Sequence, residues 1–154
     1  MKLSKQGADM IKGFEGCVLK AYRCPANVLT IGYGHTGPDV TKGLLWTQQQ
    51  ADEAFAADVE RFERGVSTAV GHAIWCEAVE PYAVEQDRFD ALVSLAFNIG
   101  MQAFHKSTLL KRLMACDLDG AAEQFTVWNK AKGKFNPGLL ARRTKEMRIF
   151  LCGH

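Results

Sequence analysis

IKGFEGCVLKAYRCPANVLTIGYGHT, residues 11–36, is the stretch that decides the fold, because its periodicity changes from helical to extended within a few residues of Glu15. Upstream, apolar positions recur at spacings of three and four, and Ser4 can cap a helix over 4–14. Glycines flank Glu15 and end that helix. Two β-type segments follow, 18–22 and 28–33, separated by a turn at 24–27. A small antiparallel hairpin or three-stranded sheet is therefore predicted directly after Glu15.

The rest of the chain has helical patterns. Thr47 and Gln50 form a capping box that opens a long amphipathic helix at about 47–66. After an irregular stretch through Pro81, a nearly all-apolar helix is predicted over 89–99, with Gly100 as its stop. Three more helices are predicted to begin at the following caps: Ser107, Asp119 and Asn136-Pro137.

These elements predict an α+β, mainly α, architecture in a single domain over 1–154. A small sheet-bearing N-terminal lobe takes about 15–50, and a larger helical lobe takes about 67–154 together with the N-terminal helix. The long helix at 47–66 would connect the two lobes.

Composition excludes several protein classes. The 154 residues are 47% apolar and 23% charged, as in an ordinary globular domain. No apolar stretch exceeds four residues, whereas a membrane-spanning helix needs roughly 20. The basic N-terminus reaches Asp9 before any apolar run, so we expect no secretory signal and synthesis in the cytoplasm.

The five cysteines and four histidines are scattered, without a CxxC pair. We therefore expect no metal and no cofactor. Four cysteines lie beside apolar residues and are predicted to be buried thiols, namely Cys17, Cys76, Cys116 and Cys152. Cys24 differs, because it lies in a polar segment next to a proline.

Charge is unevenly distributed along the chain. The net charge of +2 arises from +3 over residues 1–50, −7 over 51–100 and +6 over 101–154. Basic ends suit an anionic polymer such as nucleic acid or bacterial cell wall, although solvated helix faces explain the charge equally well. The basic runs lack interleaved aromatic residues apart from Phe135, and no nucleic-acid-binding module is present, so nucleic acid is not an expected partner.

Two motifs carry possible chemistry. Residues 32–37 satisfy G-x-G-x-x-G, but Pro38 follows in place of the helix N-terminus that a dinucleotide needs, so this interpretation is rejected. Glu15, at the end of an apolar helix between two glycines, has the setting of a general acid with a raised pKa, although a surface glutamate is the commoner finding.

Three segments, at 11–16, 20–23 and 29–36, closely resemble the phage-type lysozymes, the endolysins of glycoside hydrolase family 24. The catalytic signature of that family is Glu, eight residues, Asp or Cys, five residues, Thr, and Glu15, Cys24 and Thr30 match this spacing. Further segments similar to the family follow in family order, at 96–100, 107–110, 121–125 with Trp128, and 138–143 with Glu146.

The resemblance implies a lysozyme-like fold with the active site in a cleft between the lobes. It also implies hydrolysis of the β-1,4 bond between N-acetylmuramic acid and N-acetylglucosamine in peptidoglycan. Glu15 would protonate the leaving oxygen, while Cys24 and Thr30 would position the attacking water, with inversion at the anomeric carbon. Cys24 itself has three possible roles: a thiol that holds the water, a thiolate base, or a nucleophile that gives retention.

Other family positions are matched one residue at a time. Three residues match positions at which the family contacts sugar, namely Phe97, Ser107 and Gln124. From the sequence alone, Phe97 could equally well be a buried core residue, and Ser107 could equally well be the N-cap of a helix. His35 ends the glycine-rich segment, and Arg142 or Arg143 matches an arginine that faces the catalytic glutamate. The implied partners are peptidoglycan and a phage holin that releases the enzyme to the wall in the periplasm, and a monomer is expected.

Two alternatives from other classes remain. One is a cysteine amidase or peptidase acting on the same wall, with Cys24 as nucleophile and His35 as base. The other is a catalytically silent wall-binding protein, in which Cys24 has replaced a necessary aspartate.

Overall fold

The computed structural model describes residues 1–71 and 83–153 and is mainly helical. The chain divides into two compact units, one of Asp9–Arg61 and one that combines Met1–Ala8 with Phe62–His154. We call them the sheet unit and the helical unit. The predicted irregular stretch runs from the end of the long helix through Pro81; its residues up to Val70 are helical, and residues 72–81, with Cys76, lie outside the described residues.

Helix α1 (Lys5–Glu15) begins and ends where the sequence predicts. The Ser4 hydroxyl accepts a hydrogen bond from the Gly7 N–H at 3.0 Å, which caps the first turn. The Ser4 hydroxyl also donates to the Asp90 carboxylate. At the other end Gly16 has a φ of 68°, so the chain leaves the helix directly after Glu15.

The sheet unit holds the predicted hairpin. Strands β1 (Val18–Arg23) and β2 (Leu29–Gly32) are antiparallel, with Tyr22 opposite Thr30. The connecting turn has Asn27 at a φ of 62°, a conformation that asparagine tolerates better than most residues. One isolated bridge, Lys20 to Leu45, adds a third segment to the sheet edge.

Helix α2 (Gln48–Val70) begins at the predicted capping box. The Thr47 N–H donates to Gln50 Oε1 at 2.8 Å, and the Gln50 N–H donates to Thr47 Oγ1 at 3.2 Å. Its apolar stripe is buried at Ala51, Phe55, Val59, Phe62 and Val66.

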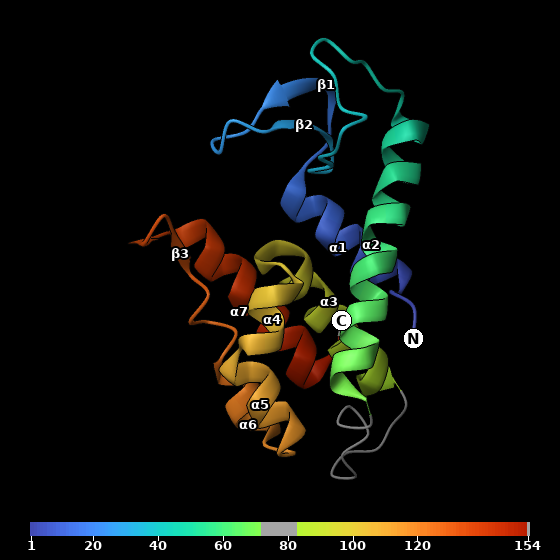
Figure 1. Cartoon of the computed structure of the whole chain (residues 1–154). Helices are drawn as coiled ribbons and strands as arrows, with labels where there is room; N and C mark the ends of the chain where they lie inside the picture. Colours follow the sequence, from blue (N-terminus) through green and yellow to red (C-terminus); the bar gives the residue numbers. More distant parts are fainter. Residues whose placement is uncertain (72–82, 154) are drawn as a thin grey trace. The chain divides into compact units, whose positions relative to one another are not determined.

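The helical unit surrounds α3 (Ala83–Ile99), which lies beside α7 (Pro137–Cys152) in Figure 1. Around this pair are α4 (Met101–Lys106), α5 (Thr108–Met114) and α6 (Leu118–Glu123). The core of this unit contains large, fully buried side chains, including Phe89, Leu92, Leu95, Leu109, Leu113, Phe125 and Phe150. Residues 88–96 of α3 are all buried, and this stretch includes the polar Arg88, Asp90 and Ser94 as well as apolar side chains.

Local signals placed the starts of α1, α2, α5 and α7 correctly, but α3 begins at Ala83 and not at about 89, and α2 extends to Val70 and not to about 66. Three further features differ from the prediction. The N-cap of α6 is Asp117, whose Oδ1 accepts from the Gly120 N–H at 2.9 Å, so the predicted cap at Asp119 is wrong. The short helix α4 was not predicted. A small hairpin of β3 (Lys130–Ala131) and β4 (Lys134–Phe135) was not predicted either, because its lysine-rich sequence lacks strand-forming residues.

The prediction of buried thiols is wrong for the three of these cysteines that are described. Cys17 directly precedes the exposed strand β1 and is itself exposed, and Cys152 is exposed at the end of α7. Cys116 is disulfide-bonded. No helix within residues 1–71 or 83–153 is long and apolar enough to cross a membrane.

Candidate active site

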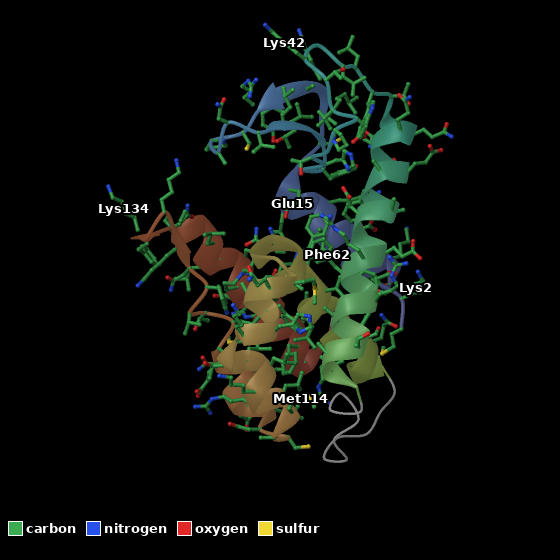
Figure 2. All side chains as sticks on the ribbon, viewed as in Figure 1. Lys2, Glu15, Lys42, Phe62, Met114 and Lys134 are labelled. Atoms are coloured by element: carbon green, nitrogen blue, oxygen red, sulfur yellow. The ribbon has the colours of Figure 1, made fainter. Side chains whose placement is uncertain are left out.

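Glu15 is the last residue of α1 and is half-buried in the sheet unit (Figure 2). A β-carbon built on Gly34 would lie 3.9 Å from Glu15 Oε2. Gly34 has a φ of 89°, which L side chains rarely adopt. The glycine-rich segment therefore passes close to the Glu15 carboxylate and leaves the space beside it free of side-chain atoms from residue 34.

Cys24 and Thr30 are brought together by the β1–β2 turn. The backbone amides of Val28 and Ala26 and the Thr30 side chain all favour the charged form of the Cys24 sulfur. These donors lower the pKa of the Cys24 thiol, with the Val28 amide as the largest cause. Thr30 is buried, and its Oγ1 is 3.1 Å from the Val28 carbonyl oxygen. A sulfur in this turn is thus better suited to negative charge than an ordinary cysteine.

His35 is held by carboxylates on both sides of its ring. Nδ1 is 2.7 Å from Asp58 Oδ2, and Nε2 is 3.0 Å from Asp39 Oδ2. Burial lowers the pKa of His35, but the hydrogen bonds to Asp58 and Asp39 outweigh burial and the pKa is raised. The ring also packs against Trp46, with ring centroids 5.3 Å apart. His35 therefore ties the glycine-rich segment to α2.

A second cluster in the sheet unit was missed from the sequence. Lys12 Nζ lies 2.6 Å from Asp52 Oδ1 and 5.2 Å from the ring centroids of both Tyr33 and Phe55. Gln48 donates to the Tyr33 hydroxyl at 2.9 Å. The cluster fixes the last turn of α1 and the segment beside Gly34 against α2. Its members are far apart in the sequence and have no local motif.

Arg142 and Arg143 converge on one buried carboxylate in the helical unit. Glu146 Oε1 accepts from Arg142 Nε at 3.1 Å and from Ser94 Oγ at 2.6 Å, while Glu146 Oε2 is 2.9 Å from Arg143 Nε. Burial raises the pKa of Glu146, and the two guanidinium groups and Ser94 oppose that effect. Arg142 also donates to the Ser94 carbonyl at 3.2 Å, so the network joins α3 to α7.

The three positions matched to sugar contacts all lie in the helical unit. Ser107 is buried, and its Oγ donates to the Phe104 carbonyl at 2.7 Å and accepts from the Leu110 N–H at 3.1 Å. Its hydroxyl therefore acts as the N-cap of α5. Phe97 is half-buried, with its ring centroid 5.1 Å from that of Phe62. Gln124 is the half-buried C-cap residue of α6.

No set of three or more potential metal ligands is found among the described residues. The chemistry that the side chains offer is that of a carboxylic acid, a hydrogen-bonded sulfur and a hydroxyl within one unit. This combination suits proton transfer and the positioning of water.

The family model described as phage lysozyme matches residues 12–146. The endolysin of Bacillus phage PZA is 40% identical over 99% of this chain, and the chain spans 56% of that protein's length.

Two solved structures cover nearly all of the chain. The endolysin from Escherichia coli O157:H7 phage FAHEc1 is 40% identical, with a TM-score of 0.83 over 100% of this chain and 96% of that one. The muramidase domain of SpmX from Asticaccaulis excentricus is 32% identical, with a TM-score of 0.83 over 97% of each chain.

Proposed function

Because this chain belongs to the phage lysozyme family, we propose that it is a muramidase that hydrolyses the β-1,4 bond between N-acetylmuramic acid and N-acetylglucosamine in peptidoglycan, as an endolysin does during host lysis. The observation that carries the proposal is the arrangement of the sheet unit. Glu15 ends α1 beside the side-chain-free Gly34, and the next hairpin joins Cys24 to Thr30.

Glu15 acts as the general acid. Its proton passes to the glycosidic oxygen as the C–O bond breaks, which removes the need to expel an alkoxide from the sugar. The open space beside Gly34 lets a sugar approach the carboxyl group without meeting another side chain from that segment.

Cys24 and Thr30 position and activate the water. The Val28 and Ala26 amides stabilise a thiolate at Cys24, so the sulfur can take the proton of a water that attacks the anomeric carbon from the face opposite Glu15. Thr30 holds the same water through its hydroxyl. The outcome is a single displacement with inversion, in which the water oxygen becomes the new anomeric hydroxyl.

The helical unit supplies further substrate contacts in this proposal. Phe97 and Gln124 are half-buried and retain some exposed surface for sugar, whereas Ser107 contributes by fixing the start of α5. Arg142 and Arg143 have a supporting role, through their buried ion pairs with Glu146. The enzyme acts as a monomer without a cofactor, is made in the host cytoplasm and reaches the wall through a phage holin.

The cysteine amidase alternative is less well supported by the geometry. A Cys–His pair needs an imidazole nitrogen free to accept the thiol proton. Both ring nitrogens of His35 are within hydrogen-bond distance of carboxylates, Asp58 on one side and Asp39 on the other.

Product analysis on purified peptidoglycan tests the proposal. A muramidase releases new reducing ends and no new free amines, whereas an amidase or peptidase releases amines and a wall-binding protein releases neither. NMR of the first-formed product should show the α-anomer. A β-anomer would contradict inversion and make Cys24 the nucleophile of a covalent intermediate.

A further inference from the structure

The β3–β4 hairpin, residues 130–135, is a compact projection with a defined geometry. Lys130 pairs with Phe135 and Ala131 pairs with Lys134 in an antiparallel register. The two connecting residues both have positive φ, 51° at Lys132 and 76° at Gly133, as a type I′ turn requires.

The hairpin presents cations and an aromatic ring to solvent. Directly opposed residues share a face, so the Lys130 and Phe135 side chains lie on the same side of the ribbon. Phe135 is 60% exposed, and all three lysines are exposed. Figure 2 shows Lys134 at the outer end of the hairpin, away from α5 and α6 of the same unit.

The surrounding sequence carries no exposed acid. Within the described range 124–153 the only carboxylate side chain is that of Glu146, which is completely buried. The outward stripe of α7 lines a shallow groove of about 540 Å³, in which the apolar Leu140 is followed by the cations Lys145 and Arg148. Cationic and apolar groups therefore lie next to each other on this part of the helical unit.

From this combination we propose that the β3–β4 hairpin binds the surface of an anionic phospholipid bilayer. The lysine ammonium groups would meet the lipid phosphates, and the Phe135 ring would enter the boundary between headgroups and acyl chains. A soluble polyphosphate chain would satisfy the lysines equally well but would leave Phe135 in water, so the exposed ring favours the bilayer.

This binding activity goes beyond wall hydrolysis and does not depend on it. Contact would be peripheral. Electrostatic attraction brings the hairpin to the surface, and burial of the ring holds it there.

Co-sedimentation of the full chain with vesicles tests the proposal at low salt. Vesicles of phosphatidylglycerol and phosphatidylcholine in equal parts are compared with vesicles of phosphatidylcholine alone. The informative variant is Lys132→Asn, because asparagine before Gly133 is favoured in a type I′ turn and the hairpin should remain folded. Lys111→Gln, at an exposed lysine of α5, is the matched charge control.

We expect binding to the anionic vesicles only. Lys132→Asn should weaken it about fivefold, as the loss of one interfacial lysine does, and Lys111→Gln should leave it unchanged. Phe135→Ser should weaken vesicle binding about tenfold, since the apolar contribution is lost, yet leave retention on immobilised polyphosphate unchanged.

Two results would overturn the proposal. One is equal vesicle binding by the parent and by both hairpin variants. The other is binding that Lys132→Asn weakens but Phe135→Ser does not, which would assign the hairpin to a soluble polyanion. Because the readout is vesicle binding, neither result bears on the proposed muramidase activity.

Discussion

His35 Nδ1 lies 2.7 Å from Asp58 Oδ2 across 23 residues of sequence, and this contact joins the glycine-rich segment to the middle of α2. Both side chains are mostly shielded from solvent, with 18% and 19% of their surface exposed. The strength of this contact within the sheet unit therefore depends on the protonation of His35, and so on pH.

The free energy of unfolding should fall as the pH rises through neutrality, because the His35–Asp58 contact weakens when His35 loses its proton. The pKa of His35 is raised in the folded state, so its contribution is fully present below the unfolded value of about 6.5 and is lost as the pH rises through the folded value. Asp58→Asn should lower the free energy of unfolding by about 1 to 2 kcal/mol near pH 5.5 and flatten its decline with pH. Urea unfolding at several pH values measures both effects.

Asp39→Asn is the matched control, because Asp39 is 59% exposed and contacts the other ring nitrogen. It should cost less than Asp58→Asn at every pH. Equal pH profiles for the parent and Asp58→Asn would contradict the assignment.

The buried carboxylate of Glu146 predicts a large stability effect. Glu146→Gln removes a buried carboxylate that pairs with two buried guanidinium groups, and removing one partner of a buried ion pair typically costs about 3–5 kcal/mol. Urea unfolding of Glu146→Gln against Glu123→Gln, at an exposed glutamate of α6, measures the difference. The network interpretation fails if the two variants unfold within about 0.5 kcal/mol of each other.

Features that depend on interactions between residues close in the sequence could be predicted, whereas features that depend on distant residues could not. Ser4, Thr47 and Asn136 act on backbone groups within four residues, and their caps were predicted correctly. Asp117 and Asp119 are two acids in one turn, and residue type alone cannot say which of them has its carboxylate at the Gly120 N–H.

Long-range partners could not be predicted. The pairing of Lys12 with Asp52, and of His35 with Asp58, depends on how α1 and the glycine-rich segment pack on α2. In the candidate site, the spacing of Glu15, Cys24 and Thr30 was visible in the sequence. The amide donors to the Cys24 sulfur come from the conformation of the turn and were not visible.

Glu15 should be indispensable for catalysis. Glu15→Gln keeps the shape of the side chain and removes its proton, and loss of a general acid typically costs about 10² to 10⁴ in rate. Turbidity clearing of purified peptidoglycan measures the loss, with Glu53→Gln on the exposed side of α2 as the control. A folded Glu15→Gln variant that clears the wall within a few fold of the parent would rule out this role.

Adding a single methyl group at Gly34 should reduce activity strongly. Gly34→Ala forces an L side chain into a φ of 89°, at a cost of about 1–2 kcal/mol, and puts a methyl group 3.9 Å from Glu15 Oε2. We expect peptidoglycan clearing to fall at least tenfold at a temperature where the variant is still folded. Gly13→Ala is the control, because nothing lies within 4 Å of its added methyl group and it should stabilise α1 without changing activity.

Cys24 should give the enzyme an activity that depends on thiolate formation. A free thiol has a pKa near 8.5, and the Val28 and Ala26 amides place that of Cys24 below its usual value. If the thiolate is the base, kcat/KM should rise with pH and level off below about pH 8.5.

Cys24→Asp should stay active, and the rise of kcat/KM should move to lower pH, because a carboxylate ionises at lower pH than a thiol and can accept hydrogen bonds from the same amides. Cys24→Ser cannot ionise in this range and should lose on the order of a hundredfold. The pH profiles of the three proteins decide the matter, since a neutral water-holding thiol predicts a flat profile and nearly full activity for Cys24→Ser.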